Sequence, residues 1–325
     1  MKVLYISDGN SPDYQCDVLF HGLRSLLGPN LVELNHVWHM YESSFRVDGR
    51  QKEELYGRGF SLYGTLPDCP VDHSRIEEEI ANHSYDFIVF GSLLRCQTHL
   101  MTVIQHYSPE DILFIDGEDH HHLIKLFLNR GLYFKRELEH PHPGVFPIHF
   151  GIPKEKILPK PTPKTRVLAH MDPNDPSTYI YDTEEAYYGG YQESLLGLTS
   201  KKAGWDCMRH YEILANRCVP LFTDIDDCPA LTLHRLPKIE ISFLKSIYKD
   251  LKSRGEESFL LAPEGRAVVD HYEQVIHKAF VEHCTTEAVA KHVIRTWQAV
   301  KASRKSRDSQ FLFMDPEDRL SWEAA

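Results

Sequence analysis

Short apolar runs that alternate with amphipathic segments are the feature that most constrains the fold of this chain. Each run suits a buried strand, and the first four lie at 1–7, 31–34, 86–91 and 112–115. Segments with helical spacing of their apolar residues stand between these runs, at 16–27, 74–81 and 97–107. This alternation predicts a doubly wound α/β sheet, in which ligands bind above the carboxyl ends of the strands.

Acidic residues follow two of these runs, at the edge of the sheet where ligands bind. Asp8, Asp13 and Asp17 come after the first run, and either Asp13 or Asp17 can simply cap the helix that follows. Asp116 and Glu118 come after the fourth run, where one acid can again serve as a helix cap.

Residues 38–68 lose the regular periodicity and are rich in aromatic residues and glycines. This pattern predicts a long irregular excursion rather than a helix. Aromatic excursions either bind flat or ring-shaped ligands, sugars included, or form an ordinary satellite core beneath a loop. The sequence leaves both interpretations open.

Composition excludes several classes of function. The net charge of -11 disfavours a nucleic-acid backbone as the main partner. Seven cysteines without a Cys-x-x-Cys pair indicate reduced thiols rather than a disulfide framework or a zinc ribbon. Neighbouring histidines at 120–122 cannot all face one metal on a regular element, so we expect no metal site. With no membrane-length apolar run and no signal peptide, we expect a cytoplasmic protein without an integral membrane segment.

A proline-rich segment at 139–164 divides the chain into two halves. Its prolines stiffen the connection, and a second sheet begins at 166–169. Further helices are predicted at 121–128, 183–195 (with an interruption at Gly189-Gly190), 243–252, 263–284 and 286–302. A chain of 325 residues suits two domains. We expect them at 1–150 and 151–310, followed by an acidic tail at 311–325.

The stretch 197–222 predicts a loop, a helix over 205–217 and a strand over 219–222. A helix N-terminus carries unpaired N–H groups and a positive dipole, which suit a phosphate or diphosphate. Lys201 and Lys202 stand just upstream and add positive charge. Alternatively, both lysines are ordinary solvated loop charges.

Within this predicted helix, three side chains that could contact a nucleotide share one face. Trp205, Arg209 and Glu212 stand at i, i+4 and i+7, so an aromatic plane, a guanidinium and a carboxylate point the same way. The alternative is a core tryptophan beside a surface Arg–Glu ion pair worth a few tenths of a kcal/mol.

The run at 209–222, Arg-His-Tyr-Glu-Ile-Leu-Ala-Asn-Arg-Cys-Val-Pro-Leu-Phe, resembles the signature of the second domain of GT-B glycosyltransferases, either family 1/4-like or exostosin-like. In those enzymes a helical Glu, followed by Leu-Ala, a turn and Val-Pro, holds the ribose of a sugar nucleotide, and the matching residue is Glu212. The family usually has Gly at the turn where this chain has Asn216-Arg217, and Asn tolerates a left-handed conformation. The resemblance covers a small part of the chain and implies an α/β fold with two Rossmann-like domains that face a cleft.

For the donor side, the resemblance implies a hexosyl- or pentosyltransferase that takes a nucleotide-sugar as co-substrate and needs no metal or other cofactor. Glu212 would hold the ribose. Arg209, Lys201 or Lys202 and the helix N-terminus would hold the diphosphate. Asp224 or Asp226, which follow the strand at 219–222, would contact hydroxyls of the sugar, unless both are ordinary solvated loop acids.

For the acceptor side, the resemblance implies that Asp13 accepts the proton of a hydroxyl on a saccharide or another acceptor, if the reaction inverts. Asp8, Asp116 and Glu118 would lie near that acceptor, and the tail at 311–325 would pack back on the first domain. Two alternatives stay open: an epimerase or hydrolase of the same architecture, and a non-catalytic nucleotide-sugar sensor. The net charge weighs against modified DNA as acceptor.

Overall fold

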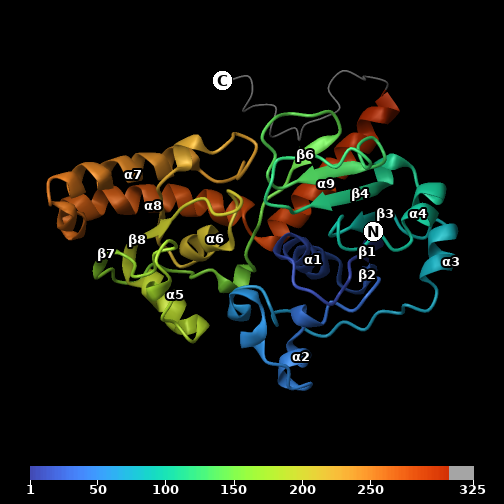
Figure 1. The fold of residues 1–325 in the computed structure, drawn as a ribbon, viewed down its shortest axis with the longest axis horizontal. Coiled ribbons are helices and arrows are strands. Elements are labelled where there is room, and N and C mark those ends of the chain that lie inside the picture. The colour runs from blue at the N-terminus through green and yellow to red at the C-terminus, as the bar shows by residue number, and fades with distance from the viewer. Residues whose placement is uncertain (307–325) are drawn as a thin grey trace.

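The computed structural model describes residues 1–306, with side chains described as far as residue 303. The predicted tail at 311–325 lies outside the described residues. The described chain is α/β, with one six-stranded and one three-stranded parallel sheet (Figure 1). Such parallel sheets with helices on their faces are compatible with Rossmann-like folds.

The first sheet has the strand order β2-β1-β3-β4-β5-β6, and all neighbouring strands are parallel. Its strands are β1 (Val3–Ile6), β2 (Leu31–Glu33), β3 (Phe87–Phe90), β4 (Ile112–Asp116), β5 (Leu132–Lys135) and β6 (Val145–Pro147). Almost every residue of these strands is buried. Burial on both faces explains why the strands read as continuous apolar runs instead of alternating ones.

Helices cover both faces of this sheet. The first half contains α1 (Tyr14–Leu27), α2 (Glu42–Arg46), α3 (Ile76–Ala81) and α4 (Leu100–His106). One face packs against α1 and against α9 (Thr286–Ser306), and the other packs against α3 and α4. At Gly22 in α1, an added Cβ would lie 1.9 Å from the Thr286 carbonyl oxygen, so only glycine permits this close packing of α1 on α9.

The second sheet has the order β7-β8-β9, again parallel. Its strands are β7 (Arg166–Leu168), β8 (Ser194–Thr199) and β9 (Val219–Phe222). Its helices are α5 (Glu184–Gln192), α6 (Met208–Ala215), α7 (Lys238–Ser253) and α8 (Pro263–His283). In Figure 1, α7 and α8 run side by side at one end of the molecule.

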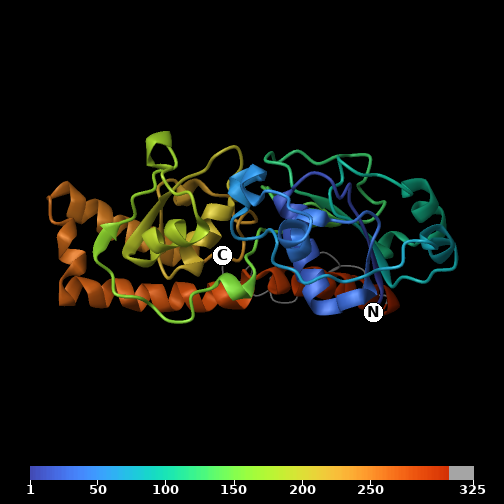
Figure 2. The ribbon, with the colours of Figure 1, turned by 90° about the horizontal axis from the view of Figure 1, so that it is seen from below.

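The chain returns from the second half to the first through its last described helices. Figure 2 shows α8 and α9 following one another along one side of both halves. A β-bridge between Ile152 and Thr285 joins the two segments where the chain crosses. On the first half, Trp297 Nε1 of α9 donates to Asp111 Oδ1 at 2.9 Å. The domain ranges 1–150 and 151–310 stay a prediction, but α9 packs against α1, within the first half.

Three predicted helices differ in the structure. No helix forms at 121–128, where the chain makes turns: the histidines at 120–122 are exposed, and the Ile124 N–H donates to the Tyr133 hydroxyl instead of a helical carbonyl. The helix predicted at 183–195 is α5, which runs unbroken through Gly189-Gly190 because three buried tyrosines on it supply a strong apolar face. The helix predicted over 205–217 is α6, which begins only at Met208.

Two further details of the second half were predicted incorrectly. Strand β8 falls where a helix end and the start of a loop were expected. In the structure an added Cβ at Gly197 would lie 3.0 Å from the Ile213 side chain, so this glycine allows α6 to pack closely on the strand. After α6 the left-handed residue is Arg217 (φ 55), while Asn216 has φ -96. Asn216 instead uses its side chain to bond Gln192 and the Glu212 carbonyl.

Candidate functional site

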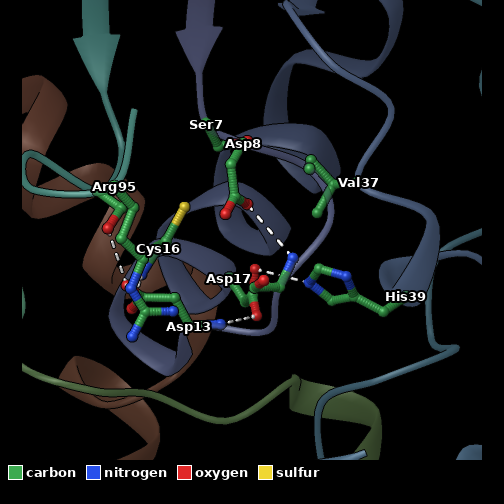
Figure 3. Close-up of a pocket in the computed structure, with 11 residues that line it drawn as sticks. Ser7, Asp8, Asp13, Cys16, Asp17, Val37, His39 and Arg95 are labelled. Carbon is green, nitrogen blue, oxygen red and sulfur yellow. Dashed lines mark hydrogen bonds and ion pairs between the residues drawn. The ribbon is translucent and has the colours of Figure 1, made fainter. Parts of the chain in front are cut away.

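A small cavity lies at the carboxyl ends of β1 and β3, where the strand order reverses. Strand β1 has β2 on one side and β3 on the other, so the loops that follow β1 and β3 diverge and leave a crevice, the usual ligand position in open parallel sheets. The cavity is shown in Figure 3 and is lined by Ser7, Asp8, Gly9, Ser11, Asp13, Cys16, Asp17, Val37, His39, Ser92 and Arg95. Its volume of about 10 Å³ leaves room for no more than about one water molecule.

Asp13 caps α1, as one of the two interpretations predicted. Its Oδ1 accepts the backbone N–H groups of Gln15 (3.1 Å) and Cys16 (3.2 Å). Its Oδ2 turns to the cavity, accepts the Ser92 hydroxyl at 3.0 Å and lies 3.4 Å from Arg95 Nε. The side chain is 16% exposed. One oxygen therefore has a structural role, while the other is held between a hydroxyl and a cation at the ligand edge of the sheet.

A buried His–Asp pair, His39 and Asp17, is hydrogen-bonded to the backbone of Asp13. Asp17 Oδ2 accepts the backbone N–H of Asp13 at 2.8 Å, and Asp17 Oδ1 lies 3.0 Å from His39 Nε2. Burial raises the pKa of Asp17 above its usual value, and the neighbouring His39 opposes that rise. Within the described residues, His39 Nδ1 is buried without a hydrogen-bond partner. No sequence pattern singles out His39, which is one histidine of twenty and lies in the irregular excursion.

Asp8 also lines the cavity, but its carboxylate shapes its own loop. Asp8 Oδ1 accepts the backbone N–H groups of Asn10 at 3.1 Å and Ser11 at 3.3 Å, the geometry of an Asx turn. The second carboxylate oxygen is not used in this turn. Asp8 therefore sits where it was predicted, beside Asp13 at the end of β1 (Figure 3).

The predicted acceptor residues after β4 belong to a buried network. Asp116 accepts the Lys135 ammonium at 2.8 Å and also the Tyr133 hydroxyl. Asp116 and Lys135 are almost fully buried, whereas Glu118 is half-buried. The turn between the two acids approaches the cavity, since an added Cβ at Gly117 would lie 3.7 Å from Asp13 Oδ1. Asp116 is therefore a partnered structural group, and Glu118 is the more accessible of the two predicted acids.

The loop after β8 brings together several residues predicted to bind the donor. The backbone N–H of Lys201 donates to both oxygens of Asp224, at 3.2 and 3.3 Å. Lys201 Nζ lies 4.8 Å from the centre of the Trp205 ring, within cation–π range. Lys202 Nζ donates to the Pro173 carbonyl. Because Trp205 precedes α6, the predicted helical face of Trp205, Arg209 and Glu212 does not exist, and Trp205 lies in the loop before the helix.

Arg209 and Glu212 lie on α6, as predicted, in different surroundings. Arg209 Nη2 donates to the Tyr179 hydroxyl at 3.1 Å, and Nη1 is buried with no partner among residues 1–303. Glu212 is 8% exposed, and both of its oxygens are occupied: Oε1 by the Ser61 hydroxyl at 2.6 Å and Oε2 by the Tyr187 hydroxyl at 2.7 Å. Burial raises the pKa of Glu212 above its usual value, although these hydrogen bonds oppose the rise.

A buried ionic cluster joins the carboxyl end of β5 to the loop before α6. Glu137 accepts the backbone N–H groups of Trp205 and Asp206 at 3.0 and 2.9 Å. Arg136 donates to Glu137 at 2.9 Å and to the Asp206 carbonyl at 2.7 Å. Burial raises the pKa of Asp206 to about 7. This cluster fixes the Trp205 loop of the second half against the first sheet.

Within the described residues, no three His, Cys, Asp or Glu side chains are grouped as a metal ion would need. No helix in the described part of the chain is long and apolar enough to cross a membrane. A scan against protein-family models finds no family that matches, and a search of curated proteins finds no significant match.

Proposed function

We propose that this protein is a glycosyltransferase with a GT-B arrangement, which moves a sugar from a nucleotide-sugar to an acceptor hydroxyl without a metal ion. The observation that carries the proposal is the contact between the predicted donor loop and the carboxyl edge of the sheet that bears Asp13. The loop that bears Trp205 is bonded by Glu137 at the carboxyl end of β5, in the same sheet that holds Asp13 at its switch point. Donor and acceptor groups on such facing edges could meet.

On the acceptor side, Asp13 Oδ2 is the proposed base. Oδ1 stays bound to the N-terminus of α1, so Oδ2 is the oxygen that can take the proton of an acceptor hydroxyl once the Ser92 hydroxyl turns away. The acceptor oxygen then attacks the anomeric carbon, and the electron pair of the broken C–O bond leaves on the nucleoside diphosphate. Asp17 is a positioning residue, because its carboxylate accepts the backbone N–H of Asp13 and is itself hydrogen-bonded to His39.

On the donor side, preorganised positive groups would stabilise the negative charge that develops on the leaving diphosphate. Lys201 is exposed and fixed through its backbone to Asp224. Arg209 offers Nη1, a buried N–H group without a partner in the described structure. Glu212 would accept ribose hydroxyls, a role that requires the Ser61 hydroxyl to leave. The co-substrate is the nucleotide-sugar, and the proposal needs no other cofactor.

Product analysis by mass spectrometry tests this proposal. The protein is incubated in EDTA with UDP-, GDP-, ADP-, CMP- and dTDP-sugars, each with and without a panel of saccharide and small hydroxyl acceptors. Glycosyl transfer predicts that one donor is consumed only when an acceptor is present. Consumption without acceptor identifies an epimerase or hydrolase, and binding without consumption identifies a sensor.

A further inference from the structure

One segment of the first half reaches across to the second half and covers Glu212. Residues 56–64, which we call the strap, belong to the irregular excursion after β2. Figure 2 shows this part of the chain, in blue, between the two halves of the molecule. Phe60 stacks on Tyr187 of α5 at 5.9 Å between ring centres, and Arg58 pairs with Asp182 just before α5.

Ser61 is the centre of the contact. Its hydroxyl donates to Glu212 Oε1 at 2.6 Å and accepts the Tyr188 hydroxyl at 2.7 Å. Its backbone N–H donates to Glu184 Oε1 at 2.6 Å, and the residue is fully buried. A hydroxyl of the chain itself thus occupies the carboxylate oxygen on which the resemblance places a ligand hydroxyl.

The backbone of the strap is unfavourable for a permanent structural element. Positive φ values occur at 57, 58, 59, 61 and 64. Arg58 (φ 57) and Ser61 (φ 69) carry a Cβ, so each left-handed conformation costs about 1 kcal/mol or more. Backbone hydrogen bonds within the strap include the Phe60 N–H to the Gly57 carbonyl at 3.2 Å and the Leu62 N–H to the Phe60 carbonyl at 2.8 Å, and neither reaches the second half. The closed form therefore depends on the side-chain contacts around Ser61.

The two ends of the strap differ in how firmly they are held. Tyr56 and Arg58 are exposed, whereas Leu62 and Tyr63 are fully buried. Tyr63 packs against His39 at 5.3 Å between ring centres, and the Gly64 N–H donates to the His39 carbonyl at 2.9 Å. The strap is thus anchored to the first half at 62–64, beside the cavity that contains Asp13, and contacts the second half through 58–61.

We propose that the strap is a lid whose Ser61 hydroxyl occupies Glu212 until a ligand hydroxyl replaces it. The exchange replaces one hydroxyl–carboxylate hydrogen bond with another, so the two bonds contribute nearly equal free energy. Opening also releases the backbone strain of Arg58 and Ser61. Because ligands bind only the open form, the lid weakens apparent affinity in proportion to its closed population. The identity of the ligand rests on the proposed glycosyl transfer; the opening of the lid does not.

Hydrogen exchange measured by mass spectrometry on the free protein tests the lid without any ligand. Peptides covering 56–61 are expected to exchange at least about tenfold faster than those of β1 and β8, since local opening costs less than global unfolding. Ser61→Ala should accelerate exchange in 56–61 and in α6. Ser43→Ala is the matched control, because Ser43 also bonds a carboxylate, that of Asp68, within the same excursion but away from Glu212. Equal protection of 56–61 and β1, or equal effects of the two variants, would overturn the lid.

Titration of the two variants with UDP-glucose, GDP-glucose and ADP-glucose then tests what opens the lid. The sugar nucleotide that binds should bind Ser61→Ala about fivefold tighter than Ser43→Ala, and should speed exchange in 56–61 while slowing it in α6. Weaker binding by Ser61→Ala makes Ser61 part of a ligand site and contradicts the lid. If none of the three binds either variant while 56–61 still opens, the lid stands and the donor assignment fails.

Discussion

Two carboxylates mark the two ends of the proposed site, and they are held in different ways. Asp13 lies in a crevice that the strand order of its own sheet creates, with one oxygen capping a helix and the other beside Ser92 and Arg95. Glu212 lies on a helix of a small three-stranded unit and is covered by Ser61 from the other half of the chain. The first end is formed by local topology, whereas the second is completed by a long-range contact.

The largest effect is expected from a substitution at Asp13, which tests whether this carboxylate does more than cap a helix. Asn caps helices as well as Asp does, so Asp13→Asn should leave the free energy of unfolding within about 0.5 kcal/mol of the wild type. Loss of the proposed base should lower turnover by about 10²- to 10⁴-fold. Denaturant titration and initial rates measure the two quantities. A variant that loses stability and keeps its turnover would restrict Asp13 to capping.

A smaller effect is expected at the Glu212 end. Glu212→Gln keeps the size of the side chain and removes its charge, so nucleotide-sugar affinity should fall by about 1 to 3 kcal/mol. Tyr187→Phe is the matched control, because it removes the hydroxyl on Oε2 and leaves the carboxylate in place. Isothermal titration calorimetry measures the nucleotide-sugar affinity of the wild type and of both variants. Equal affinities for wild type and Glu212→Gln would remove this residue from the donor site.

The smallest expected effect concerns pH and sharpens the contrast between the two ends. His210 of α6 is buried between Thr199 and the Trp205 carbonyl, and burial lowers its pKa from 6.5 to about 3. In acid, His210 therefore binds a proton in the unfolded chain but stays neutral in the folded chain. The contribution of this neutral ring to the free energy of unfolding is complete above pH 6.5 and is lost as the pH falls towards 3. At pH 5.5 the loss should be about 1.4 kcal/mol.

Urea titration of wild type and His210→Gln between pH 7.5 and 5 checks this effect. His149, at the junction of the halves, has its pKa lowered to about 3 by burial as well, so some acid sensitivity remains in the variant. His210→Gln should show a shallower loss of stability over this range than wild type. Parallel pH profiles would mean that His210 is not buried as a neutral ring.

Much of the first half was predictable because its signals are local. The runs at 1–7, 31–34, 86–91 and 112–115 became β1, β2, β3 and β4, since a strand buried on both faces must be continuously apolar. Asp13 was one of two acids expected to cap the helix, because a cap precedes its helix in sequence, and the structure shows that cap. The excursion at 38–68 also has the irregular structure expected of it, with only short helices.

The second half was less predictable because its decisive contacts are distant in sequence. Gly197 was predicted to lie in a loop, but it belongs to β8 and packs against Ile213. The start of α6 was misplaced because Trp205 and Asp206 are fixed by Glu137, far away in the chain. No pattern near Ser61 or His39 indicates the carboxylates that each residue contacts. Strand order and long-range hydrogen bonds, which create these contacts, are not encoded in local periodicity.

Calorimetric titration of the purified protein with UDP-, GDP-, ADP-, CMP- and dTDP-sugars in EDTA tests the central claim most directly. The account predicts saturable binding of one nucleotide class without metal, weakened by Glu212→Gln and not by Asp13→Asn. Absence of binding by every nucleotide-sugar, in the wild type and also in Ser61→Ala, would contradict it.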